Sequence, residues 1–343
     1  MNIEEEWENF CNNQDTVIKD ENKVNYTLHD TEAPKCGDIY ISTKTKIIYL
    51  TKEIELKESF WKIPITDYML PTEGILKKQI KYNFINEEEI SYVEEILKKE
   101  NITDIIVLSK SKGLNKFKDV RKISIGLCKK DIISHRTKKK SAFYNCFVLI
   151  LRIKINGIFK EGHVKIFNTG KIEIPGIQTD EFMHKILEAL LYTLNTYCGL
   201  NIDINMKTCE TVLINSNFNC GYFVNREKLF DKLKYKYKIH TSYDPCSYPG
   251  IMSKFWYNEG DEIQLGIKSS KNSTQISFMI FRTGSVLIVG KCDEHILMTI
   301  YRFLINIFET EYKEIFQKSD ITIENKTKTK RKKYIKISKE IEL

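Results

Sequence analysis

The chain has 343 residues, of which 42% are apolar and 29% charged, as in a soluble protein with room for two or three modest cores. No apolar run approaches the ~20 residues of a membrane-spanning helix, and the acidic start at Glu4 to Glu6 is unlike a secretion signal. The net charge of +8 favours an anionic partner, most simply nucleic acid, although lysine-rich surfaces also serve solubility alone. Nine cysteines without any CxxC spacing predict buried thiols in a reducing compartment and no metal site.

The charge is unevenly distributed along the chain. Residues 1–34 carry nine acidic and two basic side chains, whereas residues 326–343 carry eight basic and two acidic ones. We expect a mobile acidic arm over 1–35 and a basic tail over 319–343. The basic run from Arg136 to Lys140 is interpreted equally well as a solvated surface, a phosphate-binding segment or a nuclear address.

Residues 36–115 alternate between short apolar runs and polar turns. The pattern predicts two short strands at 39–41 and 47–50 around a polar turn. Asn86, followed by three glutamates, is a typical helix start, and Ile105 to Leu108 has the pattern of a buried strand. We therefore expect an N-terminal α+β extension of unknown purpose in this range.

A first repeat is expected over residues 116–208. Its predicted elements are strands at 123–127, 143–153, 163–168 and 171–175 and a helix from Asp180 to Leu194. The alternating strands and glycine-containing turns, such as Asn156-Gly157, predict an antiparallel sheet.

A second repeat is expected over residues 209–318. Its predicted elements are a strand from Val212 to Phe218, a helix capped by Asn225, a proline-rich corner at 243–251, a polar insertion at about 257–275, and a closing hairpin followed by a helix from Glu294 to Phe308.

The two closing units are copies of each other. The stretches Ile166–Gly176 and Ile280–Gly290 lie 114 residues apart, and the same spacing relates the helices that follow, without any gap. A constant register over strand, turn, strand and helix indicates an internal duplication. Each helix covers one face of its sheet, so the other face, which carries Phe167 and Phe281, requires a partner.

These residues resemble the TATA-box-binding protein family, in particular its divergent relatives in large DNA viruses. The likeness rests on the two matched hairpins and on Thr241 to Ile251, which is similar to the "stirrup" loop of the family's second repeat. It covers about residues 120–312. It implies an α+β saddle of two pseudosymmetric repeats, with helices on the convex side and the concave sheet in the minor groove of DNA.

The resemblance also implies DNA-binding positions. They are Phe147, Phe167, Thr169, Lys171, Asn215, Asn217, Tyr248, Phe281, Thr283, Leu287 and Val289. Phe167, Phe281 and Tyr248 match aromatics that wedge between base steps, whereas the fourth wedge falls on Cys146, with Phe147 one residue away. Either Asn215 or Asn217 matches a central groove-reading asparagine, and the first repeat offers Ser124 instead.

Several positions depart from the family pattern or match its protein contacts. Glu173 and Pro175 replace small apolar and threonine residues, and a carboxylate facing phosphates is expected to weaken binding in the first repeat. Asp244 matches a stirrup acid that contacts the factor TFIIB in the family, and Cys246 replaces a second acid.

The resemblance implies a transcription initiation factor that binds A/T-rich double-stranded DNA and recruits a TFIIB-like factor and a viral RNA polymerase. No phosphate loop, nucleophile elbow or HExxH helix occurs, so we expect neither an enzyme nor a bound cofactor. The alternative is an interaction scaffold that has lost DNA bending; a glycosylase lobe would need a helix–hairpin–helix, for which no sequence remains. Host cytoplasmic factories, the nucleus and the virion are all possible locations.

Overall fold

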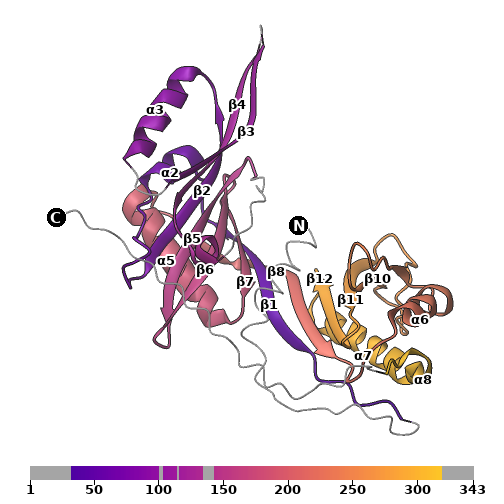
Figure 1. Ribbon diagram of the computed structural model, residues 1–343. Coiled ribbons are helices and arrows are strands. Elements are labelled where there is room, and N and C mark those ends of the chain that lie inside the picture. The colour runs from indigo at the N-terminus through magenta and orange to yellow at the C-terminus, as the bar shows by residue number, and fades with distance from the viewer. Residues whose placement is uncertain (1–31, 100–102, 114–115, 134–142, 319–343) are drawn as a thin grey trace, which may run out of the picture.

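The computed structural model describes residues 32–99, 103–113, 116–133 and 143–318, which build one large antiparallel sheet with helices packed against it (Figure 1). Within these residues the sheet has twelve strands, in the order β3-β4-β2-β5-β6-β7-β1-β8-β12-β11-β10-β9. The strands are β1 (Tyr40–Leu50), β2 (Gly74–Phe84), β3 (Thr103–Gly113), β4 (Lys116–Gly126), β5 (Cys146–Ile155), β6 (Ile158–Phe167), β7 (Lys171–Ile177), β8 (Ile204–Asn219), β9 (His240–Ser242), β10 (Ile251–Tyr257), β11 (Thr274–Ile280) and β12 (Ser285–Gly290). The basic run at 136–140, the tail and nearly all of the acidic arm lie outside the described residues.

The helices lie between and after the strands. They are α2 (Leu56–Lys62), α3 (Glu87–Lys98), α4 (Lys129–Ile133), α5 (Asp180–Cys198), α6 (Arg226–Asp231), the π-helical turn η2 (Lys232–Lys236), α7 (Glu294–Thr310) and α8 (Tyr312–Ile315). As the sequence predicts, Asn86 caps α3 and Asn225 caps α6, each by accepting a hydrogen bond from a backbone N–H three residues on.

Two similar halves meet where β1 pairs with β8 at the centre of the sheet. The first half runs through β1, α2, β2, β5, β6, β7 and α5, and the second half runs through β8, α6, β9, β10, β11, β12 and α7. Each series places its strands in the same order outward from the centre. The α+β fold of two matched repeats is therefore confirmed.

The long helices α5 and α7 begin in the same way. The side chains of Thr179 and Asp293, again 114 residues apart, accept hydrogen bonds from the N–H groups of Phe182 and Ile296. Such caps satisfy N–H groups that have no partner within the helix. Each helix then buries an apolar stripe in the core of its own half, and these stripes consist of Phe182, Ile186, Leu187, Leu190 and Leu194 in α5, and of Leu297, Ile300, Leu304, Ile307 and Phe308 in α7.

One long strand replaces the two short strands expected around a polar turn at residues 39–50. The polar residues remain in β1 because their charges are paired on the helical side of the sheet. The Lys44 ammonium lies 2.9 Å from a carboxylate oxygen of Glu294, and that of Lys46 lies 2.8 Å from Asp180. Both acids occupy the first turn of a long helix, where a negative charge is favourable.

Residues 36–115 share a sheet and a core with the expected first repeat. β1 pairs with β7, and β2 pairs with β5, so a boundary at residue 115 would cut through the sheet. The sequence misses this because the matched hairpins lie at the end of the repeat, far from its first strand. We propose that the first repeat runs from β1 to α5 and that α3, β3 and β4 are an insertion within it.

The strand expected to be buried at 105–108 lies at the edge of the sheet. It belongs to β3, which pairs only with β4 among the described strands, and the side chains of Ile105 and Val107 are 37% and 53% exposed. β-branched residues are also common on half-buried strands, so the aliphatic run does not by itself indicate a fully buried strand.

We predict that the matched substitutions Leu190→Ala and Leu304→Ala each lower the free energy of unfolding by about 2–5 kcal/mol, because both side chains are fully buried. Urea titrations followed by circular dichroism would measure the loss. Tyr192→Ala, on the exposed side of α5, is the control and should change the unfolding free energy by less than about 0.5 kcal/mol. Equal stability of all three variants would contradict the assignment of the two cores.

Candidate nucleic-acid interface

Strand alternation separates a face that packs against α5 and α7 from an opposite face, which we call the distal face. In β12, Val286 and Ile288 belong to the core, so Ser285, Leu287 and Val289 lie on the distal face. The register brings Asn217 opposite Leu287 and Asn215 opposite Val289. These asparagines therefore lie beside the two aliphatic residues.

Both candidate asparagines, Asn215 and Asn217, lie on the distal face. Asn215 donates a hydrogen bond from Nδ2 to Oγ1 of Thr43 at 3.3 Å, across the central β1–β8 pair. Ser124, expected as their first-half counterpart, is instead on β4 near the outer edge, where its hydroxyl accepts from Gln79. The sequence reasoning fails there because the central strand of the first half is β1.

Two aromatic rings mark the outer end of the distal face in the second half. The ring centroids of Tyr248 and Phe281 lie 6.1 Å apart with an interplanar angle of 59°. Gly250 lies beside both rings, and a Cβ atom there would come within 2.9 Å of Phe281 and 3.0 Å of Tyr248. Only glycine fits at this position without displacing the pair. The half-buried rings can act together on a flat ligand.

The loop that carries Tyr248 is an exposed corner with its own hydrogen bonds. The Asp244 carboxylate accepts from the backbone N–H of Cys246 at 3.0 Å, and the Asp244 carbonyl accepts from the N–H of Tyr248 at 2.9 Å. Hydrogen bonds from Ser247 and Cys246 hold the pKa of Asp244 below its ordinary value. The acid is thus exposed and ionised at neutral pH, as a contact for a protein partner would require.

Phe167 of the first half lies opposite a cysteine, whereas its counterpart Phe281 lies beside Tyr248. Phe167 lies opposite Cys146 in the β5–β6 ladder, and the Lys171 ammonium lies 4.7 Å from the centroid of the Phe167 ring. Burial raises the pKa of the Cys146 thiol to about 11, so this cysteine is neutral. Phe147 is fully buried in the core, with its ring 6.3 Å from that of Phe60, and is removed from the candidate surface.

Turn residues occupy the ends of both matched hairpins. Thr169 is exposed between β6 and β7, and Thr283 is exposed between β11 and β12. The Thr283 hydroxyl donates to Oγ of Ser285 at 3.2 Å. Both threonines therefore lie next to the phenylalanines of their hairpins.

Glu173 lies on the distal face, as expected, but its charge is paired. It is directly opposite Lys165 in the β6–β7 ladder, and its Oε1 lies 2.7 Å from the Lys165 ammonium. Glu173 is only 8% exposed. The sequence signal for this partner is the alternation of β6, which puts Lys165 on the same face as Phe167.

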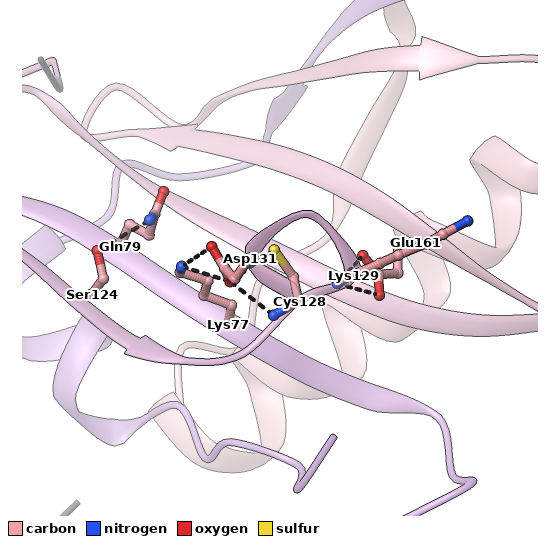
Figure 2. Close-up of polar contacts among 7 residues, drawn as sticks. All are labelled: Lys77, Gln79, Ser124, Cys128, Lys129, Asp131 and Glu161. Atoms are coloured by element: carbon pink, nitrogen blue, oxygen red, sulfur yellow. Dashed lines mark hydrogen bonds and ion pairs between the residues drawn. The ribbon is translucent and has the colours of Figure 1, made fainter. Parts of the chain in front are cut away.

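The segment that follows β4, residues 127–133, crosses the distal face of the first half (Figure 2). Both Asp131 carboxylate oxygens lie 2.8 Å from the ammonium of Lys77 on β2, and the backbone N–H of Lys129 donates to Glu161 on β6. Burial would raise the pKa of Asp131, but hydrogen bonds from Lys77 and Cys128 outweigh it and lower the pKa. The second half has no such crossing among its described residues.

The crossing segment also contributes to the lowered pKa of a neighbouring histidine, His163. His163 is on the distal face of β6, opposite Ile150. Loss of hydration, aided by the positive charges of Lys130 and Lys165, lowers its pKa to about 4, so it is neutral at physiological pH. Sequence reasoning did not foresee these contacts, because they join residues from two separate strands, β2 and β6, and a short helix.

The described residues show neither a metal site nor a membrane helix. No three His, Cys, Asp or Glu side chains among them are grouped so that they could hold a metal ion. None of their helices is both long and apolar enough to cross a membrane.

Comparison with known proteins finds similarity to TATA-box-binding proteins. No protein-family model matches the chain. The TATA-box-binding protein-like protein of Acanthamoeba polyphaga mimivirus is 24% identical over 199 residues, which are 54% of this chain and 53% of that protein. This chain thus spans about half the length of that relative. The solved TBP of Methanococcus jannaschii is 12% identical, with a TM-score of 0.38 over 80% of this chain and 97% of that one. The sequence similarity and the two-repeat sheet agree with the resemblance expected from the sequence: the chain is similar to a viral TATA-box-binding protein-like protein.

Proposed function

We propose that the chain is a transcription initiation factor whose distal face binds A/T-rich double-stranded DNA in the minor groove. The observation that carries this proposal is the strip of Asn215, Asn217, Leu287 and Val289 that leads to the Tyr248–Phe281 pair. The minor groove offers few donors and acceptors, so an apolar surface with a few amides suits it. Aromatic wedges unstack base steps and kink the duplex, as in known minor-groove proteins.

The two halves contribute unequally in this proposal. The second half offers two adjacent aromatic rings and an uncharged strip, whereas the first half offers Phe167 opposite Cys146, beside the paired charges of Glu173 and Lys165. The crossing at Asp131 further narrows the distal face of the first half. We therefore expect the main kink at the second half, with A/T-rich deformable sequence required there.

The partners follow from the exposed corner of the second half. The ionised, exposed Asp244 supports recruitment of a TFIIB-like factor, and through it of a viral RNA polymerase. Such a role places the chain where viral genes are transcribed, in a cytoplasmic factory, in the nucleus or inside the virion.

An interaction scaffold that no longer bends DNA is the second candidate function. The crossing at residues 127–133 and the Glu173 carboxylate favour it, because both occupy the face that would meet DNA in the first half. The two candidates differ in one measurable property, which is the bend of a bound duplex.

We predict that Phe281→Ala weakens binding of a short A/T-rich duplex by on the order of a few kcal/mol and reduces its bend, because a wedge is lost. Fluorescence anisotropy would give the affinity, and energy transfer between dyes at the duplex ends would give the bend. Phe223→Ala, whose ring lies beside Arg282 in the same half but outside the distal strip, is the matched control. Unchanged affinity and bend with Phe281→Ala would exclude this surface as the wedge.

Glu173→Val alone should give little gain in DNA affinity, because it leaves the ammonium of the partly buried Lys165 without its carboxylate. The double variant Glu173→Val with Lys165→Met removes both charges and should bind the same duplex more tightly than either single variant. A double-mutant cycle of the anisotropy data measures this coupling. Additive effects of the two substitutions would show that the ion pair does not influence binding.

A further inference from the structure

The insertion within the first repeat extends the distal face by two strands. Gln79 on β2 lies opposite Ser124 on β4, and the two side chains are joined by a 3.0 Å hydrogen bond (Figure 2). Gln79 also lies opposite Val148 on β5, which lies opposite Lys165 on β6. This row of register partners shows that the same face continues from β6 onto the inserted β4.

Two lysines occupy the next position along this face. Lys81 on β2 and Lys122 on β4 lie directly opposite each other, two residues beyond Gln79 and Ser124. Like charges at directly opposed positions of an antiparallel pair are destabilising. The Lys81 ammonium lies over the ring of Tyr144, 3.3 Å from its centroid, and Lys118 is exposed further along β4. Positive charge is thus concentrated at this position of the distal face.

The described residues of the second half have no such lysine pair. Its outermost strand is β9, where Ser242 lies opposite Met252 and His240 lies opposite Lys254 on β10. The counterpart of β9 in the first half is β2, which is followed by β4 and β3 instead of an edge. The lysine pair is therefore a property of the inserted strands and not of the repeated fold.

We propose that Lys81 and Lys122 bind backbone phosphates of duplex DNA beyond the segment held by the repeated part of the sheet. The inference rests on the proposed function. Three strand spacings separate β6, which carries Phe167, from β4, and at ~4.8 Å each this is roughly 14 Å, or about four base pairs of duplex. The inserted strands thus lengthen the DNA footprint at one end only, which gives the complex a polarity.

The test uses the full chain and two labelled duplexes, one with an A/T-rich core of about 14 base pairs and one with the same core extended by about eight G/C pairs at both ends. Each phosphate neutralised contributes about 0.9 to the slope of log affinity against log salt concentration. We expect the extended duplex to bind the unaltered chain several-fold more tightly, with a slope steeper by roughly 2.

Lys81→Ala with Lys122→Ala should abolish both gains and leave binding of the core duplex within about twofold of the unaltered chain. Lys228→Ala with Lys313→Ala removes the same charge from exposed positions on α6 and α8 and should keep both gains. Lys81→Arg with Lys122→Arg should also keep both gains, and this variant separates loss of charge from misfolding.

Two outcomes would overturn the inference separately from the proposed function. If the alanine variant retains the gain from the extended duplex, the lysine pair does not contact DNA, while binding of the core still supports the proposed function. If the alanine and control variants lose affinity equally for both duplexes, the effect is one of net charge. Failure of the unaltered chain to bind either duplex would refute the proposed function, and this inference with it.

Discussion

The pairing of β1 with β8 at the centre is the constraint on which the two faces of the sheet depend. These two strands are the first of their repeats, and each forms a ladder with the last strand of its own repeat, β7 or β12. Because side chains alternate between faces, the register at the centre decides which residues of the outer strands face α5 and α7 and which face away. The surface that carries Asn215, Leu287 and Phe281 exists because this register holds.

The same scaffold supports two chemically different halves. Both halves present a phenylalanine at the end of a matched hairpin, but its neighbour is Tyr248 in one half and Cys146 in the other. In β12 the central distal residue is Leu287, whereas its counterpart 114 residues earlier is Glu173, held by Lys165. The halves are alike in backbone and core, and they differ where a ligand would touch them. The two halves of a duplicated protein can thus have different binding roles while they keep the same fold.

The sequence predicted best what local rules decide. The caps at Asn86 and Asn225, the helices after both hairpins and the antiparallel pairing follow from capping residues and hydrophobic spacing. The start that we propose for the first repeat has no local sequence pattern, because the pairing of β1 with β8 joins residues more than 150 positions apart. The face of Phe147 was undecided for a related reason, since a shift of one residue exchanges the two faces of a strand.

The ion pairs on the distal face could not be predicted from the sequence either. The Lys165–Glu173 pair and the Lys77–Asp131 pair join residues 8 and 54 positions apart, and their charges are unremarkable in the sequence. A charged residue on an apolar face suggests a missing partner, but only the register between strands identifies it. Predictions for single residues of the first half were therefore less secure than the fold that contains them.

The central position of β1 has a consequence for how the protein is made. β1 is the first described strand to leave the ribosome, yet its nearest partner, β7, begins at Lys171, 121 residues after the end of β1 at Leu50, and β8 follows later still. During synthesis, its two edges thus remain open until almost the whole first half has emerged. Open strand edges invite pairing with other chains. The lysines at positions 44 and 46 are well suited to this interval, because charge on an unpaired strand discourages association between nascent chains before Glu294 and Asp180 are available to neutralise it.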